Sequence, residues 1–95
     1  MLVKITTINE ELLNFNSAHG HKKYTLSIIY VNPIHVVALK EDLQYVELNV
    51  KKQLPEGFDK NQKFTRVIIN YGSMGEEIVA IGDIKGIASI INEVK

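Results

Sequence analysis

The sequence predicts an α+β fold: an antiparallel five- to six-stranded sheet, or a small barrel, followed by one C-terminal helix. Three observations lead to this prediction. Several segments alternate between apolar and polar residues, a glycine-containing turn joins the last two of them, and the final segment carries apolar residues at helical spacing. A chain of 95 residues builds one modest core, so residues 1–95 are predicted to form a single domain.

Six segments are predicted to be strands because they are rich in β-branched residues and alternate with period two. In chain order they are residues 2–9, 24–31, 34–40, 45–51, 64–71 and 76–81. Residues 10–13 allow a single helical turn, and residues 41–44 are predicted to turn the chain. Asn32-Pro33 separates the second strand from the third, because proline cannot donate to a sheet ladder. "GSMG", residues 72–75, predicts a hairpin.

Two further segments complete the domain. Residues 51–63 are predicted to form a long polar loop with a turn at residues 54–57, and loops of this length are commonly functional or mobile. Residues 83–94 are predicted to form the helix, with Asp83 as its N-cap. Its apolar stripe consists of Ile84, Ile87, Ala88, Ile91 and Val94.

The segment "SIIYVNPIHVVAL", residues 27–39, is more apolar than a sheet with one wet face requires. Strands that are apolar on both faces need a cover on both faces. The C-terminal helix covers one face, so the other is expected to be closed by curling into a barrel or by a second copy of the chain. The sequence therefore predicts a homo-oligomer.

The charge balance and composition exclude several classes of function. Eleven basic and eleven acidic residues give a formal net charge of zero, which does not favour nucleic acid or an anionic membrane as a partner. Cysteine is absent, so disulfides and thiolate chemistry are excluded. The first residues lack the basic and apolar regions of a signal peptide, and no apolar run approaches the roughly 18 residues of a membrane span. We therefore expect a soluble, cytoplasmic protein.

The histidines are the candidate metal ligands. His19 and His21 are separated by one glycine, and His35 is a possible third ligand. Zinc sites require three or four protein ligands, and the chain contains no metal motif such as HExxH. A His-x-His pair in a loop rich in Gly, Ser and Asn is more typical of a solvated turn. The sequence therefore predicts no metal and no cofactor, and leaves His19 and His21 as the weak candidates.

Basic and aromatic residues near strand ends are candidates for a nucleotide-binding groove, because such sites pair positive charge with aromatic stacking. The candidate ligand-binding residues are Lys22, Lys23, Tyr24, Tyr30, Lys51, Lys52 and Arg66, and Tyr45 and Tyr71 add two further rings. The alternative interpretation is structural: the lysines guard exposed edges, and the tyrosines pack their rings in a small sheet. The zero net charge favours this second interpretation.

No catalytic set is recognised. Ser17 is close to His19 and His21 in the sequence, but no nucleophile elbow surrounds it. Glu76 and Glu77 follow "GSMG" and would repel phosphate, so this turn does not predict a phosphate-binding loop. The remaining carboxylates occur as adjacent pairs at turns, as solvated charge commonly does. We therefore expect a protein that is not an enzyme.

Two stretches, "YVNPIHVVALKED" and "TRVIINYGSMGEEIVAIGDIKGIASIINEV", resemble the small FlbD-like proteins of bacterial flagellar operons, a resemblance that covers about residues 29–95. The positions that carry it are Asn32, Pro33, Val36, Leu39, Thr65, Val67, Ile69, Gly72, Val79, Ile87 and Ile91. The pattern is also similar to that of small bacteriophage β-proteins. The chain differs from the family in its extra segment before Asn32, in the insertion at residues 51–63, and in "GDIKG" at the start of the helix. The resemblance implies a β-rich fold closed by a helix and implies no catalytic residues.

These observations predict a small non-enzymatic binding or regulatory protein that acts through protein–protein contacts, as a homo-oligomer or on an unknown protein partner. The alternative is a phage-type counter-defence or host-takeover protein that sequesters a small nucleotide ligand or masks a host enzyme. The lysine–tyrosine combination and the unusual loops motivate that alternative.

Overall fold

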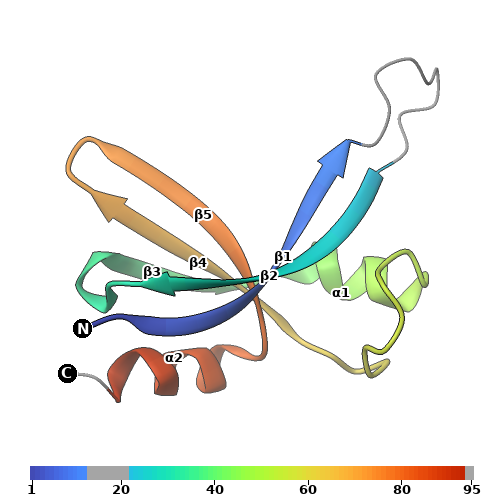
Figure 1. The fold of residues 1–95 in the computed structure, drawn as a ribbon. Helices are drawn as coiled ribbons and strands as arrows, with labels where there is room; N and C mark the ends of the chain where they lie inside the picture. Colours follow the sequence, from blue (N-terminus) through green and yellow to red (C-terminus); the bar gives the residue numbers. More distant parts are fainter. Residues whose placement is uncertain (13–21, 94–95) are drawn as a thin grey trace.

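The computed structural model describes residues 1–12 and 22–93, with only the backbone described at residues 11, 12 and 22. Its centre is one five-stranded antiparallel sheet with the strand order β2-β1-β5-β4-β3 (Figure 1). The strands are β1 (Val3–Leu12), β2 (Lys22–Val31), β3 (Val36–Glu41), β4 (Phe64–Tyr71) and β5 (Met74–Ile81), and the helices are α1 (Leu43–Val50) and α2 (Ile84–Asn92). The predicted antiparallel sheet with a C-terminal helix is confirmed, and the sheet is open, with β2 and β3 as its edges.

The two edge strands are consecutive in the chain, and this curls the sheet. The link from β2 to β3 contains a short 3-10 turn, Pro33–His35, in which the Asn32 side chain accepts a hydrogen bond from the Ile34 amide at 3.1 Å. Such a turn advances only about 2 Å per residue, so the link of about 13 Å is shorter than the roughly 19 Å that four strand spacings span. The edges must therefore approach each other at this end. Val31 and Val36 accordingly pack into one apolar cluster, although four strand spacings separate them along the sheet.

The face enclosed by this curl, called the inner face, holds the main core. Its central buried side chains are Ile5 from β1, Val67 from β4 and Ala80 from β5. The apolar stripe of α2 closes the cluster with Ile87 and Ile91, both almost fully buried, and α2 lies beneath the strands in Figure 1. The predicted helix is thus present, with a slightly earlier end.

The N-terminal cap of α2 explains a glycine within its first turn. The Asp83 carboxylate accepts a hydrogen bond from the Gly86 amide at 2.8 Å, as predicted for an N-cap aspartate. A Cβ atom at Gly86 would lie 2.8 Å from that same carboxylate oxygen. The glycine therefore leaves room for the cap.

The prediction of a strand at residues 45–51 is wrong, because α1 spans Leu43–Val50. The alternation of Val46, Leu48 and Val50 suggested a strand, but in the helix Tyr45, Val46 and Leu48 pack against the sheet and Val50 is 65% exposed. The N-cap decides the outcome: the side chain of Asp42 accepts a hydrogen bond from the Tyr45 amide at 3.0 Å. Residues 41–44, predicted to be a turn, therefore include the start of this helix.

Smaller corrections concern the strand boundaries. β1 continues to Leu12, so residues 10–12 are strand and not part of a helical turn. The hairpin turn of "GSMG" is shorter than predicted, because Tyr71 pairs directly with Met74. Gly72 has a φ of +69°, a conformation that glycine adopts at low steric cost.

The opposite face of the sheet, called the outer face, has its own smaller core. Ile8 of β1 and Phe64 of β4 pack against Tyr45 of α1 and Leu54 of the following loop. The predicted need for a cover on the second face is therefore met partly within the chain, by a helix that the sequence pattern concealed.

Asp42 holds this outer-face core together, which predicts an uneven sensitivity to substitution. Its carboxylate is buried, caps α1, and accepts hydrogen bonds from Arg66 Nη2 at 2.8 Å and Nε at 3.2 Å. We expect Asp42→Ala to lower the free energy of unfolding by about 2–4 kcal/mol, because it removes a helix cap and leaves Arg66 without its buried partner. Asp42→Asn keeps the cap and should cost less. Urea unfolding measures both changes.

The control for this prediction is Glu77→Gln. Glu77 accepts from the same arginine at 3.3 Å, but half of its side chain is exposed, and exposed ion pairs contribute about 0–1 kcal/mol. If Asp42→Ala proved as stable as Glu77→Gln, Asp42 would not anchor α1.

Candidate functional site

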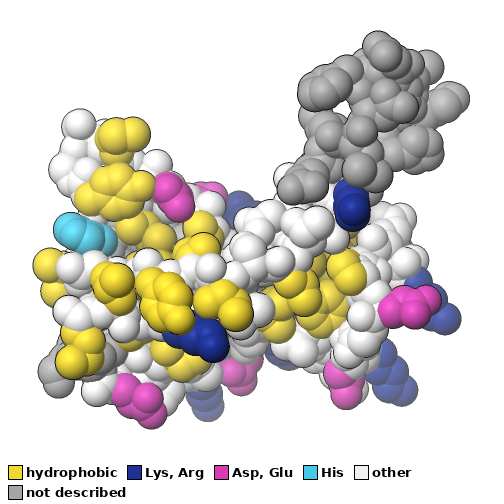
Figure 2. All heavy atoms as spheres, viewed as in Figure 1, with side chains coloured by type: hydrophobic (Ala, Val, Ile, Leu, Met, Phe, Trp, Pro, Cys, Tyr) yellow, Lys and Arg dark blue, Asp and Glu magenta, His cyan; other side chains and the backbone are white. Residues whose placement is uncertain are grey.

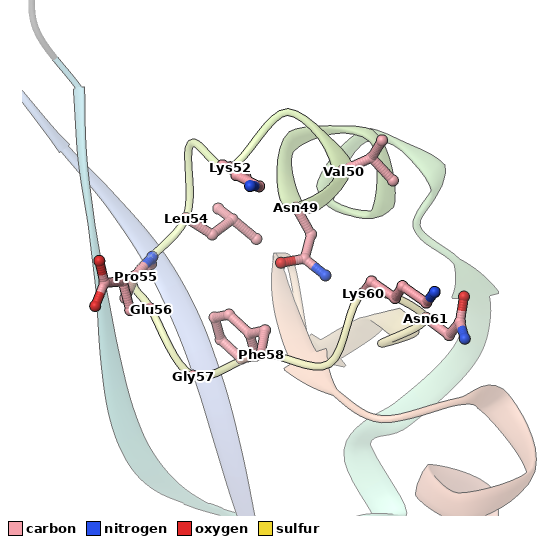
Figure 3. A pocket seen from close by; sticks show the side chains of 10 residues that line it. All are labelled: Asn49, Val50, Lys52, Leu54, Pro55, Glu56, Gly57, Phe58, Lys60 and Asn61. Carbon is pink, nitrogen blue, oxygen red and sulfur yellow. The ribbon is translucent and has the colours of Figure 1, made fainter.

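A cavity of about 690 Å³ lies between the C-terminal end of α1 and the loop of residues 51–63 (Figure 3). It is lined by Asn49, Val50, Lys52, Leu54, Pro55, Glu56, Gly57, Phe58, Lys60 and Asn61. Its apolar part is formed by Leu54 and Phe58, whose side chains point towards Asn49 in Figure 3. Its volume lies within the range of small-molecule sites.

The end of α1 brings Lys52 to this cavity. The amide of Gln53 donates to the Leu48 carbonyl, and the amide of Lys52 donates to the Asn49 carbonyl, both at 3.0 Å. This pair of bonds defines a Schellman C-cap, in which the residue in the left-handed conformation is most commonly glycine. Here that residue is Lys52, with a φ of +58°. A lysine in this conformation lowers the stability of the fold by roughly 1 kcal/mol relative to glycine. Lys52 therefore places a cationic side chain at a position where the backbone is strained.

The loop is attached to the helix and to the outer-face core. Asn49 Nδ2 donates to the Asp59 carbonyl at 2.8 Å, and the Asp59 side chain accepts from the Asn61 amide at 2.8 Å. The ring of Phe58 packs edge-on against Phe64 with 5.6 Å between centroids. These contacts hold open a space with an apolar floor and with lysines on its border, an arrangement suited to a small ligand that joins an apolar or aromatic part to an anionic group.

The structure does not bring the seven predicted ligand-binding residues into one groove. Lys52 lines the cavity, whereas the adjacent Lys51 forms an exposed ion pair with Glu47 at 3.1 Å. Arg66 is engaged by Asp42 and Glu77.

The remaining four candidate residues lie on β2. The strand begins with Lys22 and the exposed Lys23. The ring of Tyr24 packs edge-on against Tyr45 at 5.7 Å. Tyr30 lies on the same face as Tyr24 but six residues further along, roughly 20 Å away, and is 63% exposed.

Of the residues that line the cavity, the sequence interpretation named only Lys52 as a candidate, and it missed the polar and aromatic side chains of Asn49, Phe58, Lys60 and Asn61. Asn49 was assigned to a strand, which hid its position at the end of a helix beside the loop. The loop itself carried the available signal, since it is long and combines lysines with an aromatic residue.

Two of the three candidate metal ligands, His19 and His21, lie outside the described residues. Ser17, considered above as a nucleophile, also lies outside them. The ring of His35 packs edge-on against Tyr71 with 6.0 Å between centroids. Within residues 1–12 and 22–93, no three His, Cys, Asp or Glu side chains are grouped so as to hold a metal ion.

Three ionisable side chains among the described residues have raised pKa values, and their surroundings in the structure explain each shift. Burial, reinforced by the negative charge of Glu10, raises the pKa of the Tyr45 hydroxyl. The hydrogen bonds to Asp42 raise the pKa of the Arg66 guanidinium. The Tyr71 hydroxyl donates to Glu76 at 2.9 Å, and this bond raises its pKa.

No family model matches this chain, and neither the curated proteins nor the solved structures give a match. Among the described residues, no helix has the length and apolar character needed to span a bilayer.

The burial of the Tyr45 side chain predicts a loss of stability in alkali. An unfolded tyrosine titrates near pH 10, and burial raises the pKa of Tyr45 above that value in the folded protein. The stability that the neutral Tyr45 side chain contributes is fully present below about pH 10. It is lost as the pH rises through the pKa of Tyr45 in the folded protein, because the tyrosine of the unfolded chain releases its proton first. Tyr45→Phe should make the free energy of unfolding fall less steeply above pH 10, as measured by urea unfolding at several pH values. Equal slopes for the two proteins would contradict the assignment.

Proposed function

We propose that this protein is a small non-enzymatic binding protein that acts through protein–protein contacts and associates with itself. The observation that carries the proposal is an apolar strip on the outer face of β2. Leu26, Ile28 and Tyr30 are 50%, 54% and 63% exposed, although they alternate along one side of a regular strand. Leu2, directly before β1 and on the same face, is 57% exposed.

The strip lies where the outer-face cover ends. α1 and its loop cover Ile8 and Phe64, whereas the strip lies further along β2 than the Tyr24–Tyr45 contact. Figure 2 shows apolar side chains gathered on the face turned towards the viewer, in the region where β2 crosses in front of the other strands in Figure 1. A contiguous exposed apolar patch commonly marks an interaction site, whereas single exposed apolar residues are normal on a protein surface. The zero net charge adds no long-range repulsion between copies.

This proposal predicts self-association driven by apolar contact. Light scattering over a range of protein concentrations should show a mass above that of the 10.7 kDa monomer in the micromolar range. Raising the salt concentration to about 0.5 M should leave this mass unchanged or increase it, because salt screens ion pairs but not apolar burial. A strict monomer at high micromolar concentration would remove the proposal.

A second candidate function is the sequestration of a small anionic ligand, such as a nucleotide, in the cavity beside α1. The observation that favours it is Lys52, which holds a positive charge at the cavity border in a backbone conformation that suits glycine. Lys60 adds a second ammonium group, and Phe58 offers a ring for stacking.

This candidate predicts that nucleotides or cyclic nucleotides raise the melting temperature, since a ligand that binds only the folded state stabilises it. Lys52→Gly should weaken that shift while leaving the unliganded protein at least as stable, because glycine adopts the required φ without strain. The matched control is Lys51→Ala, which removes the neighbouring charge outside the cavity lining. No shift with any nucleotide, or an equal shift in Lys52→Gly and wild type, would contradict sequestration.

A further inference from the structure

The two edges of the sheet differ in how they oppose pairing with another strand. β3 has six residues, a register shift between Val36 and Ala38, and the charged pair Lys40-Glu41 at its end. Short length, irregular pairing and charge are the features that protect an edge strand. β3 is therefore a guarded edge.

β2 has none of these features between its first two residues and Val31, where the two edges of the sheet approach each other. It has ten residues, and its pairing with β1 runs without a register shift from Val3↔Val31 to Leu12↔Lys22. Lys22 and Lys23 lie at its beginning, and no charged residue follows as far as Val31. A long, regular and uncharged edge is a template for another strand.

The sequence of β2 is also almost symmetric about one residue. Reading "YTLSIIY" outward from Ser27, Leu26 mirrors Ile28, Thr25 mirrors Ile29, and Tyr24 mirrors Tyr30. A two-fold interface brings residue i of one copy to residue j of the other, and j to i. Antiparallel pairing about Ser27 would therefore place Leu26 opposite Ile28 and tyrosine opposite tyrosine, with Thr25 opposite Ile29.

The geometry points to a specific interface: two copies of this chain pair through their β2 edges, antiparallel, with the two-fold axis at Ser27. The result is a continuous sheet with five strands from each copy. This inference rests on the self-association proposed above and assigns the strand edge through which it occurs. In this register the half-exposed Leu26 of each copy packs beside Ile28 of the other, and Tyr30 packs beside Tyr24.

Charges and polar groups are compatible with this register. On β1, Lys4 pairs with Tyr30 and Glu10 pairs with Tyr24. Each of the two rows that pair Tyr30 with Tyr24 therefore has Lys4 of one copy on one side and Glu10 of the other copy on the opposite side. Lys23 of each copy comes opposite Val31 of the other and not opposite a lysine.

A small residue suits the position on the two-fold axis, because there Ser27 of one copy lies opposite Ser27 of the other. The hydroxyl of Ser27 is already bonded within its own chain, to Thr7 Oγ1 at 2.9 Å and Asn9 Nδ2 at 2.7 Å. Pairing at the axis therefore leaves no new hydroxyl without a partner.

The absence of native cysteine allows a direct test of this register. Opposed residues of an antiparallel pair have Cα atoms about 4.5–5.5 Å apart, within the range that a disulfide spans. Ser27→Cys should therefore form a disulfide-linked dimer on mild oxidation. The matched control is Thr25→Cys on the same strand and face, whose counterpart would lie roughly 13 Å further along the sheet. Thr25→Cys should remain uncrosslinked.

A second pair of variants tests the surface without cysteine. Ile28→Lys puts a charge into the centre of the strip and should weaken self-association about 10-fold, because both cross-strand pairs between Leu26 and Ile28 are lost; analytical ultracentrifugation measures this change. Val37→Lys makes the same kind of change at a 59% exposed position on the guarded β3 edge and should leave self-association unchanged. Both positions are exposed, so circular dichroism should show folded variants.

The outcomes separate this inference from the proposed function. A wild-type monomer at high micromolar concentration removes both. An oligomer that persists in Ile28→Lys, with no cross-link in Ser27→Cys, overturns the β2 interface and leaves self-association standing. A cross-link in Ser27→Cys together with an Ile28→Lys monomer supports the interface.

Discussion

The constraint on which this fold depends is the short connection between the two edges of its sheet. Asn32 and the 3-10 turn Pro33–His35 join β2 to β3 although these strands are the furthest apart in the sheet order. The connection forces the sheet to curl, and the curl encloses one face around Ile5, Val67 and α2. The other face becomes the outside of the curl. There the available cover is α1, which at eight residues is about 12 Å long, against roughly 33 Å for the ten residues of β2. The curl thus accounts for both the closed inner core and the partly uncovered outer face.

The position of α1 decides which part of the outer face is covered. Asp42 makes three contacts that join α1 to β4: it caps α1, binds Arg66 of β4, and donates its own amide to the Phe64 carbonyl at 2.9 Å. α1 is thereby fixed near the start of β4, where Tyr45 and Leu54 reach Phe64. The loop that follows closes over the same region and forms the cavity lined by Lys52. Because this cover ends beside Ile8, its cross-strand partner Leu26 is half exposed, and Ile28 and Tyr30 further along β2 are also exposed.

The sequence predicts the sheet well because its strands carry period-two patterns and because glycine and proline mark their ends. Residues 64–71, predicted as a strand, coincide with β4, and Asp83 marks the start of α2. The prediction of a strand at residues 45–51 was wrong because the helix α1 depends on one capping side chain, that of Asp42. Asp42 is held in place by Arg66, which is 24 residues away in the sequence. The cavity could not be predicted for the same reason: Asn49 contributes to it only from the end of a helix. Periodicity also could not show that Arg66 forms ion pairs within the chain, because its two partners come from a loop and from another strand. Such pairings depend on tertiary structure and leave no local pattern.

The difference between the two edges bears on how an assembly of this chain would end. If the β2 edge paired with the β3 edge of the next copy, each addition would leave a free edge of both kinds, and the chain of copies would grow without limit. The register shift at Val36 and the charges of Lys40 and Glu41 oppose that mode. Pairing of β2 with β2 about Ser27 uses both permissive edges at once and leaves only guarded ones. The features that make β2 available for contact and those that protect β3 therefore have complementary effects: together they favour a closed pair over a growing filament.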